Sequence, residues 1–558
     1  MNNSFRIKLS SVLLSVAVLT ACTSSPSTGS SGLSGPSGSS GSSGSPVAEQ
    51  PAAQTRTPAE ASYSGKDVDV NWNPQDAAMI TLNGSNATIN GSGAAWKDGD
   101  VVITAAGTYV LSGTLDDGQI RVDVAKTDDV HLVLNGVTLH HSESSAIYIT
   151  EADMVVITVQ AGTINTVRDG SHYVFPDASE DEPNAAIFSK GDLTFNGTGT
   201  LTVRGNYNNG ITSKDDLKIV EGNITVIAAD DALMGRDLVA IKDGTLKLEA
   251  GGDGIKSTND EEEGKGGIVV EGGKLDITAG TDGFDAVTSL FISGGELVID
   301  AGDDGIHADA AIAITGGTID IRQSYEGIES AVIEISGGDI QVVSSDDGIN
   351  VAGGNDESSF NGRPGQNRFA ASSNYKLTIS GGSITVNASG DGLDANGSIY
   401  MTGGTVLVNG PTSNGNGALD YDGIFEVSGG TLIAAGSAGM AAAPSDTSSQ
   451  HAVMMYYSQS QAAGTPIQLK DADGNIITEF VPAKNYQSVV ISVPELRADA
   501  SYTFYSNGAE VVSFEITDTV TWLNESGVTE PGAGGFSGRG MGGRMRPGGG
   551  MRQGGGRP

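Results

Sequence analysis

A phrase of small and acidic residues recurs about every 22 residues through the middle of the chain. Each copy consists of Gly-Gly, an alternating apolar run, Ala or Ser, an acidic residue followed by Gly, one apolar residue and a second alternating run. The second glycine of the pair stands at Gly273, Gly295, Gly317, Gly338, Gly382 and Gly404, and the insertion from Gly353 to Asn374 replaces one period. A fixed period of this length is typical of a solenoid, in which each repeat buries its apolar side only by stacking on its neighbours.

The apolar residues within one period predict the cross-section of that solenoid. Leu297 and Ile299, then Ile306, then Ile312 and Ile314 form three inward-facing patches. Their alternation has the period of a β-strand, so three patches indicate a roughly three-sided coil. We therefore predict an all-β chain that folds as a right-handed parallel β-helix of roughly 22-residue coils, with a C-terminal β cap.

Changes of composition along the chain predict six segments. They are a lipoprotein signal peptide with its lipidation site (1–22), a Ser/Gly/Pro-rich linker (23–62), irregular N-terminal coils (63–205), regular coils (206–440), a C-terminal β cap (441–525) and a disordered Gly/Arg-rich tail (526–558). Within the cap, Ile467 to Leu469 and Ile476 to Phe480 predict a hairpin. The residues between them resemble a calcium loop but lack the Gly and Glu of an EF-hand, so a simple turn is expected.

The first residues of the chain indicate export. Arg6 and Lys8 precede an apolar stretch from Leu9 to Leu19 that is too short to span a membrane as a helix, which is typical of a signal peptide. The ending Leu-Thr-Ala-Cys resembles the lipobox of bacterial lipoproteins. This resemblance implies a lipid on Cys22 and an extracytoplasmic protein held at the membrane through that lipid only. An ordinary signal peptide with a chance cysteine is the alternative.

The charge balance excludes one class of partner. The chain has 30 basic and 68 acidic residues, a net charge of −38. Binding to nucleic acid requires concentrated Lys and Arg against the phosphates, so we expect no nucleic-acid partner.

Acidic residues recur at one corner of the predicted coil. The corner reads Asp253-Gly254, Asp282-Gly283, Asp304-Gly305, Glu326-Gly327, Asp347-Gly348 and Asp391-Gly392, with a second acidic residue three places on at Asp285, Glu329 and Asp394, Asn350 at the equivalent place, and one just before at Asp230, Asp303 and Asp346. Equivalent positions of stacked coils lie about 4.8 Å apart. Carboxylates at that distance repel by roughly 0.9 kcal/mol per pair in water and about 3.5 kcal/mol at an effective dielectric of 20.

Two interpretations of this corner remain open. In the first, Asp-Gly is turn chemistry, with Asp bonding local backbone and Gly taking a positive φ. In the second, the corner is a ladder of oxygen ligands for Ca²⁺, which prefers carboxylates, carbonyls and water. Charged residues fill all six corners, although Asn would serve a turn equally well, which favours calcium. The predicted ligands are Asp253, Asp282, Asp285, Asp303, Asp304, Asp346, Asp347, Asp391 and Asp394.

The sequence shows no convincing catalytic group, and we expect a protein that is not an enzyme. The six histidines are scattered, and His307 is predicted to be a surface residue. Carboxylate pairs are so abundant that no single pair points to a glycosidase.

The residues from about Ile80 to Thr521 resemble bacterial surface carbohydrate-binding proteins built on a calcium-rich parallel β-helix. The matching pieces are Ile80–Gly84, Gly107–Gly113, Asn184–Ser189, Asn206–Ile211 and Gly251–Ser257, together with the acidic corners. The resemblance implies calcium-dependent binding of cellulose-like or acidic, pectin-type polysaccharides at the cell surface. Two coils depart from the pattern, because Ala232 follows Asp231 where Gly is usual and Glu326 replaces Asp, so calcium is not expected there.

Three functions follow from this resemblance. A bridging Ca²⁺ would reconcile the acidic chain with an acidic sugar polymer, whereas a neutral glucan needs aromatic platforms, for which Tyr207, Tyr325, Tyr400 and Tyr421 are candidates. The first alternative is a pectate-lyase-like enzyme with Lys256 or Arg322 as base. The second is a purely structural or adhesive surface protein.

Overall fold

The computed structural model divides the chain into two compact units, Met1–Pro51 and Ala52–Pro558. It describes residues 61–177, 179–352 and 374–531, which all belong to the second unit. Cys22, the signal peptide, nearly all of the linker, the insertion after residue 352 and the tail beyond residue 531 lie outside the described residues, and the expectations for them stay predictions. Among the residues that are described, no helix has the length and apolar character needed to cross a membrane.

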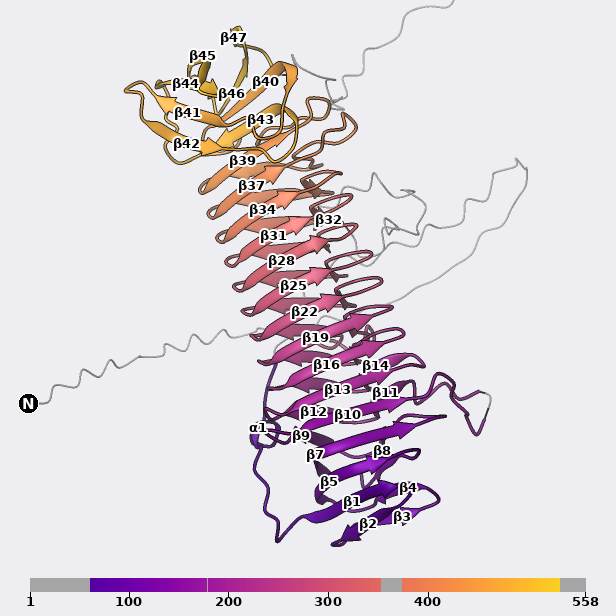
Figure 1. Ribbon diagram of the computed structural model, residues 1–558. Coiled ribbons are helices and arrows are strands. Elements are labelled where there is room, and N and C mark those ends of the chain that lie inside the picture. Colours follow the sequence, from indigo (N-terminus) through magenta and orange to yellow (C-terminus); the bar gives the residue numbers. More distant parts are fainter. Residues whose placement is uncertain (1–60, 178, 353–373, 532–558) are drawn as a thin grey trace, which may run out of the picture. The chain divides into compact units, whose positions relative to one another are not determined.

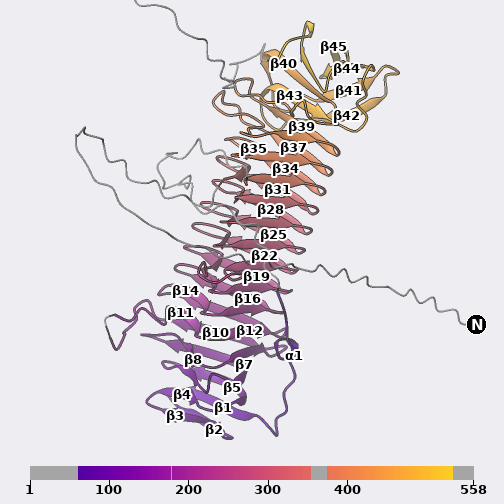
Figure 2. The same cartoon turned by 180° about the vertical axis from the view of Figure 1, so that it is seen from behind.

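The chain is all-β, and its strands form coils that stack in parallel. One coil consists of β25 (Glu296–Asp300), β26 (Ile306–Ala308) and β27 (Ala311–Ile314), and each strand pairs in parallel with the equivalent strand of the next coil. The inward patches predicted from the sequence fall on these three strands, and their apolar side chains are fully buried. The three-sided coil therefore follows from the apolar pattern, as Figures 1 and 2 show. The winding sense stays a prediction.

Three parallel ladders run along the stack. The first ladder contains β10 (Ile164–Asp169), β13 (Thr200–Gly205), β16 (Asn223–Ala228), β19 (Thr245–Ala250), β22 (Lys274–Thr278), β25, β28 (Thr318–Gln323), β31 (Asp339–Val343), β34 (Ser383–Asn387), β37 (Thr405–Asn409) and β39 (Thr431–Gly436). The second ladder contains β4 (Asp100–Ile103), β6 (Ile120–Asp123), β8 (Ile147–Glu151), β11 (Ala185–Ser189), β14 (Asn209–Ser213), β17 (Leu233–Gly235), β20 (Ile255–Ser257), β23 (Phe284–Ala286), β26, β29 (Ile328–Ser330), β32 (Ile349–Val351) and β35 (Leu393–Ala395). The third ladder contains β9 (Met154–Val159), β12 (Asp192–Asn196), β15 (Asp216–Ile219), β18 (Leu238–Ile241), β21 (Gly267–Val270), β24 (Ser289–Ile292), β27, β30 (Val332–Ile335), β33 (Lys376–Ile379), β36 (Ser398–Met401) and β38 (Phe425–Val427).

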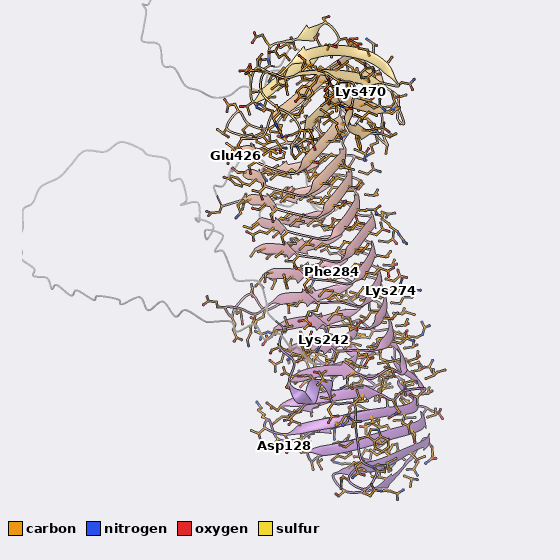
Figure 3. The ribbon with its side chains drawn as sticks, turned by 90° about the vertical axis from the view of Figure 1, so that its left-hand side faces the viewer. Asp128, Lys242, Lys274, Phe284, Glu426 and Lys470 are labelled. Carbon is orange, nitrogen blue, oxygen red and sulfur yellow. The ribbon has the colours of Figure 1, made fainter. Side chains whose placement is uncertain are left out.

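One continuous apolar core fills the stack. Each coil contributes Leu, Ile, Val or Phe from every ladder, and these side chains contact their equivalents above and below. Figure 3 labels one side chain of each kind: Phe284 of the second ladder is fully buried, whereas Lys274 of the first ladder is exposed. Burial of stacked apolar side chains is the main stabilising contribution in such an array.

The N-terminal end differs from the strand-like start expected from residue 63. The first element of the described residues is a short helix, α1 (Gly65–Val68), and an irregular segment connects it to the first strand. Two antiparallel pairs follow, β1 (Ala78–Gly84) with β2 (Ala87–Asn90) and β3 (Ala94–Lys97) with β4. Two long parallel strands, β5 (Gly107–Leu115) and β7 (Asp129–His141), then lead into the ladders.

Residues 61–77, which we call the N-terminal strap, lie against the outer face of the third ladder. Tyr63 packs on outward apolar residues of β18 and β21, and the ammonium group of Lys242 lies 4.8 Å from the centre of its ring. Asp67 accepts a hydrogen bond from Thr194 of β12 at 2.6 Å. Trp72 donates to Gln160 at 2.9 Å. The strap therefore covers apolar side chains that would otherwise face water.

The C-terminal end is mainly antiparallel. Strands β40 (Ala452–Gln461), β43 (Tyr486–Ser492), β46 (Val520–Asn524) and β47 (Gly527–Val528) continue from β39, and β41 (Ile467–Asp471), β42 (Ile476–Phe480), β44 (Ser501–Ser506) and β45 (Ala509–Glu515) form a four-stranded sheet. The predicted hairpin is confirmed, because β41 and β42 pair antiparallel. Its Asp471 carboxylate accepts the backbone N–H groups of Asp473 and Asn475 at 3.0 and 2.8 Å, as expected for a turn.

Candidate functional site

Two columns of side chains, all polar except Met234, lie side by side along the second ladder. The corner column occupies the turn before each of its strands, and the face column occupies the outward position three residues later. The corner column consists of Asp231, Asp253, Asp282, Asp304, Glu326, Asp347 and Asp391, and the face column of Met234, Lys256, Asp285, His307, Glu329, Asn350 and Asp394. The stacking predicted for the acidic corner is therefore present in the structure.

The corner column joins successive coils through hydrogen bonds. The backbone N–H of Asp304 donates to Oδ1 of Asp282 at 2.8 Å, and the N–H of Asp282 donates to Oδ1 of Asp253 at 3.0 Å. The same bond joins Asp391 to Asp347. One carboxylate oxygen at each of these corners thus satisfies a backbone donor of the next coil, which gives the corner a structural role, although the donor is not the local backbone that the turn interpretation expected.

The other part of the turn interpretation was wrong. The glycines that follow the corner residues do not have positive φ angles, which fall instead on the second glycine of each Gly-Gly pair, such as Gly295 at +100°. A Cβ atom on Gly283 would lie 2.5 Å from the carbonyl oxygen of Gly305 and 2.6 Å from a methyl group of Ile299. The corner glycine is therefore required because the coils approach closely, not because of its φ angle.

Three groups of side chains along the two columns could hold a metal ion, since the ligand atoms within each group lie within 4.8 Å of one another. They are Asp282 with Asp285 and His307, Asp304 with Glu326 and Glu329, and Asp347 with Asp391 and Asp394. Six of the nine predicted ligands are therefore brought together, which shows proximity and not the presence of an ion.

In the first group, basic residues of the chain itself neutralise part of the negative charge. Lys256 contacts the carboxylate of Asp253 and donates to Oδ2 of Asp285 at 2.7 Å, and Nδ1 of His307 lies 3.5 Å from Oδ1 of Asp285. Burial opposes ionisation of Asp285, but His307 and Lys256 hold its pKa down at about 2. Burial also opposes the charge on His307, yet the surrounding carboxylates raise its pKa to about 9. His307 was expected to be a surface residue; it occupies an outward position, but only 15% of its side chain is exposed.

Asp282, the remaining carboxyl group of the first group, forms no ion pair with these basic residues. Burial and the neighbouring Asp253 raise the pKa of Asp282 to about 7. The positive charge of Lys256 is directed to Asp253 and Asp285 instead.

The third group has no such compensation. None of the ion pairs within the described part of the chain involves Asp347, Asp391 or Asp394. Burial and the proximity of other carboxylates raise the pKa of Asp394 to about 7 and hold that of Asp347 well above its usual value. Burial likewise raises the pKa of Asp391 to about 7. This group therefore favours either protons or an added cation.

The second group is intermediate. Asp304, Glu326 and Glu329 are all buried, and burial together with Glu329 raises the pKa of Asp304. Nδ2 of Asn350 donates to Oε2 of Glu326 at 2.7 Å. Oδ1 of Asn350 is buried and accepts no hydrogen bond from the described residues. Asn350 stands in register between Glu329 and Asp394, so its amide oxygen adds a hard donor next to the third group.

These donors fit a hard divalent cation. The third group offers only carboxylate oxygens, with the amide oxygen of Asn350 in the adjoining register, and Ca²⁺ takes six to eight oxygen ligands. The first group offers an imidazole nitrogen and already contains an ammonium group, which is a poorer match. Calcium was not expected at the coil of Glu326, but the structure places that carboxylate beside two others.

The remaining predicted ligands lie outside these groups. Asp253 is engaged by Lys256. Asp303 and Asp346 precede the corner residues and belong to none of the three groups among the residues described. Sequence reasoning left out His307, Glu326 and Glu329 as ligands, although the spacing of three residues that selected Asp285 and Asp394 also marks Glu329.

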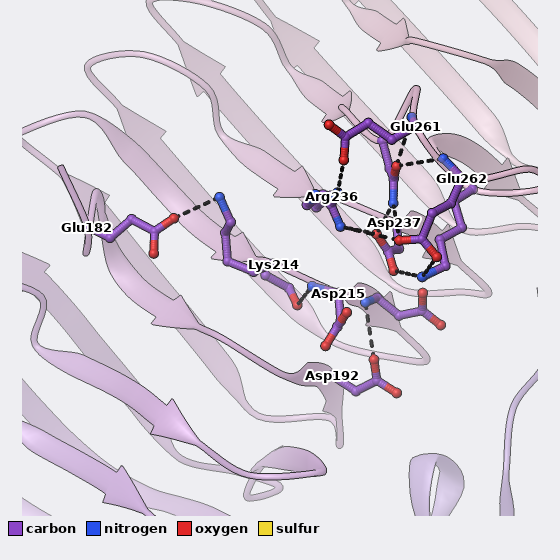
Figure 4. Close-up of polar contacts among 12 residues, drawn as sticks. Glu182, Asp192, Lys214, Asp215, Arg236, Asp237, Glu261 and Glu262 are labelled. Carbon is purple, nitrogen blue, oxygen red and sulfur yellow. Dashed lines mark hydrogen bonds and ion pairs between the residues drawn. The ribbon is translucent and has the colours of Figure 1, made fainter. Parts of the chain in front are cut away.

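Several other basic residues near the second ladder lie in the turns after its strands, at the opposite corner. Figure 4 shows this network. Arg236 and Lys265 both bind Asp237, with N to O distances of 3.2 and 2.6 Å, and Lys214 binds Glu182 at 2.8 Å. Their charges are used there and do not neutralise the acidic corner.

The four candidate tyrosines do not form one platform. The ring of Tyr207 stacks on Tyr173 at 4.1 Å, so one of its faces is covered. The hydroxyl of Tyr421 donates to the carbonyl of Ala443 at 2.7 Å, and Tyr400 lies on β36 of the third ladder. Tyr325 alone adjoins the corner column, where burial and Asp346 raise its pKa. Stacking of a sugar chain on several of these rings is therefore not supported.

Comparison with known proteins finds a family that matches the middle of the chain. Residues 97–348, just under half of the chain, match a family described as "Carbohydrate-binding domain-containing protein". This stretch matches a carbohydrate-binding domain family. The matched region contains the first two metal-ligand groups and Asp347, and it ends before Asp391.

A relative and a solved structure give further matches. A carbohydrate-binding domain-containing protein of Acetivibrio thermocellus is 45% identical over 139 residues, which are 25% of this chain and 49% of the relative, so the chain spans about half the length of the relative it matches. A solved structure titled as a polysaccharide lyase-like protein from C. thermocellum, in a gadolinium derivative, is 38% identical and covers 43% of this chain and 96% of that one, with a TM-score of 0.42.

Proposed function

We propose that the protein binds polysaccharide at the cell surface without cleaving it, and that Ca²⁺ at the acidic corner takes part in the binding. The match of residues 97–348 to a carbohydrate-binding domain family carries the ligand class. The cation is supported by the crowded carboxylates of the third group, which lack a basic partner among the described residues.

Asp347, Asp391 and Asp394 would hold the ion in this proposal. When bound, Ca²⁺ supplies positive charge to the crowded carboxylates and a coordination position for a sugar carboxylate or hydroxyl. Asp347 and Asp391 also bind backbone N–H groups of the next coil through their Oδ1 atoms, so the corner itself orients these side chains. With a net charge of −38, the chain repels an acidic polymer, and a bridging cation removes this conflict.

The geometry gives little support to a lyase in which Lys256 is the base. Burial opposes its charge, but Asp285 and Asp253 raise the pKa of Lys256, so the side chain remains an ammonium group at neutral pH. A base must be able to accept a proton, and its pKa should lie near the working pH. Arg322 is exposed and bound to Asp320 at 2.9 Å on the first ladder, away from the corner.

Retention on immobilised polygalacturonate tests this function. We expect the full chain to be retained in the presence of Ca²⁺ and released by excess chelator, without formation of unsaturated product. Asp394→Asn should weaken retention, whereas Asp320→Asn, the same chemical change on the first ladder, should not. Release of unsaturated product would instead show a lyase, and equal retention with and without the ion would overturn the calcium part.

We also infer that the coils wind in the right-handed sense, which parallel crossover connections follow almost without exception. Circular dichroism cannot assign this sense, but an experimental structure of residues 61–531 would. A left-handed coil in that structure would overturn the inference.

The lipidation of Cys22 is part of the same proposal. The apolar stretch that ends in Leu-Thr-Ala-Cys supports it. Cys22→Ala should abolish incorporation of labelled fatty acid and release the protein from the membrane fraction. A variant that is still labelled would contradict the assignment.

A further inference from the structure

A cavity of about 350 Å³ lies beside the second ladder, at the coils of the first group. Lys256, Thr258 and Asp260 line it from one coil, and His307 and Asp309 line it from a later one. Its volume is at the lower end of the range for small-molecule sites, which is about 300–1,000 Å³. It is therefore large enough for a compact ligand rather than for a whole polymer.

The lining of this cavity interleaves donors and acceptors. Lys256 and His307 offer N–H groups, Thr258 offers a hydroxyl, and Asp260 and Asp309 offer carboxylates. Sugar hydroxyls both donate and accept hydrogen bonds, so each one can bridge a donor and an acceptor of such a lining. The chemistry of the cavity therefore matches a polyhydroxylated ligand.

One polar atom of the lining has no partner within the described chain. Nε2 of His307 is buried and makes no hydrogen bond there. The Oδ1 atom of Asp309 lies 3.7 Å away, beyond hydrogen-bonding distance. A buried polar atom left without a hydrogen bond destabilises the protein. A ligand hydroxyl that forms a hydrogen bond with Nε2 would remove this cost, so the whole hydrogen bond would contribute to binding.

The charges around the cavity select against two other ligand classes. The ammonium group of Lys256 already lies between Asp253 and Asp285, so an added cation would compete with it for these two carboxylates. The carboxylates of Asp260 and Asp309 would in turn repel an anionic sugar. A neutral sugar avoids both the competition and the repulsion.

We propose that this cavity is a subsite that binds one neutral sugar unit directly, through His307 and Asp309 and without a cation. The proposal rests on the proposed function only in taking a saccharide as the ligand. The face column continues from His307 through Glu329 and Asn350 to Asp394, so the third group lies about 14 Å further along, which is three coil spacings. A polymer lying along the second ladder would contact both the cavity and the third group.

Titration of the full chain with cellohexaose and mannohexaose in excess chelator tests this subsite. At least one of these neutral probes should bind, and Ca²⁺ should leave its Kd unchanged. Asp309→Asn should raise that Kd by about tenfold, the usual effect of losing a charged hydrogen bond. Asp320→Asn is the matched control, because the two side chains are 34% and 35% exposed, and it should not change the Kd.

Thr258→Val and His307→Ala complete the test. Each should weaken binding while the melting curve shows a folded protein, and Thr258→Val keeps the test valid if His307→Ala does not fold. Failure of both probes to bind, or equal binding by Asp309→Asn and Asp320→Asn, overturns the proposal. Retention on polygalacturonate with Ca²⁺ but no hexasaccharide binding would reject this subsite alone, whereas the reverse pattern would reject the calcium-dependent function alone.

Discussion

The coils around Lys256 and those around Asp394 have the same backbone arrangement, but they differ in how their carboxylates are neutralised. Both have an acidic corner whose carboxylate accepts an N–H from the next coil, and both have a glycine pressed against the following carbonyl. In the first region the chain supplies its own cations, Lys256 and His307. In the second no described ion pair involves Asp394. The corner backbone therefore has the same structure whether or not basic residues of the chain neutralise its carboxylates.

The face column shows this difference at equivalent positions. Despite its burial, Asp285 has a pKa of about 2 because His307 and Lys256 contact it. Asp394 has a pKa raised to about 7 by burial and by Asp391. Two aspartates in the same structural position therefore differ in charge at neutral pH, and we expect only the second to depend on an added cation.

Removal of the internal cation should have the largest effect. Lys256→Met removes the only basic partner of the buried Asp253 among the described residues and leaves Asp285 with His307 alone, so the free energy of unfolding in chelator should fall by about 3–5 kcal/mol. Added Ca²⁺ should restore part of this loss. Lys274→Met is the control, since Lys274 and Glu296 form an exposed pair. Denaturant unfolding measures both, and equal stability of the two variants would contradict the comparison.

Chelation should come next. At a Ca²⁺ concentration 100 times Kd, one site stabilises the fold by about 2.7 kcal/mol, and excess chelator should remove this. Asp394→Asn should reduce the calcium response and slightly raise the melting temperature in chelator, because it relieves repulsion without breaking a corner hydrogen bond. Asp320→Asn should behave as the unmodified chain. Melting curves that superimpose with and without Ca²⁺ would reject the third group as a cation site.

The corner glycines should respond alike in both regions. A Cβ on Gly283 or Gly348 would lie 2.5 or 2.6 Å from the carbonyl oxygen of the next corner glycine. Overpacking of this kind costs about 1–3 kcal/mol. Gly283→Ala and Gly348→Ala should therefore lose similar stability, with or without Ca²⁺, in denaturant unfolding. A much larger loss at one of them would show that the two backbones are not equivalent.

The pH dependence of stability in chelator should also distinguish the two regions. Asp391 and Asp394 have folded pKa values of about 7, above the usual 3.8, so their contribution is fully present below about pH 4 and is lost as the pH rises through 7. His307, at about 9 instead of 6.5, contributes below 6.5 and loses its contribution as the pH rises through 9.

Thermal melts between pH 5 and pH 9 measure this dependence. Stability should decline by at most about 1.4 kcal/mol per pH unit for each proton released. Asp394→Asn should flatten the decline between pH 5 and 7 and leave the part between pH 7 and 9 unchanged. A rise in stability from pH 5 to 7 in chelator would contradict the pKa assignments for the third group.

The sequence predicted the features that repeat with the coil. Leu297, Ile306 and Ile312 mark three strands because each apolar patch must face the same core, and the acidic corners stack because they share the period. The pairing of Lys256 with Asp285 was hidden, since the loop from Asn259 to Gly266 lengthens that coil and breaks the 22-residue spacing.

Other features could not be predicted because one residue type serves two physical needs. Glycine suits both a positive φ angle and a close backbone approach, so the sequence could not assign Gly283 to the second. The N-terminal strap has neither a helical nor a strand period, and its position depends on single contacts such as Asp67 with Thr194. Only the folded chain shows such contacts.

The N-terminal strap also determines how the protein would respond to mechanical force. A pull on the N-terminus is applied first to Tyr63, beside β18 and β21, and not to the end of the stack. The contacts of Tyr63, Asp67 and Trp72 would open one after another, a peeling motion that needs less force than shearing parallel strands. Their release would free on the order of 50 Å of chain before any coil is loaded. The strap would thus detach and lengthen under force before the coils that carry the proposed sugar and cation sites are loaded.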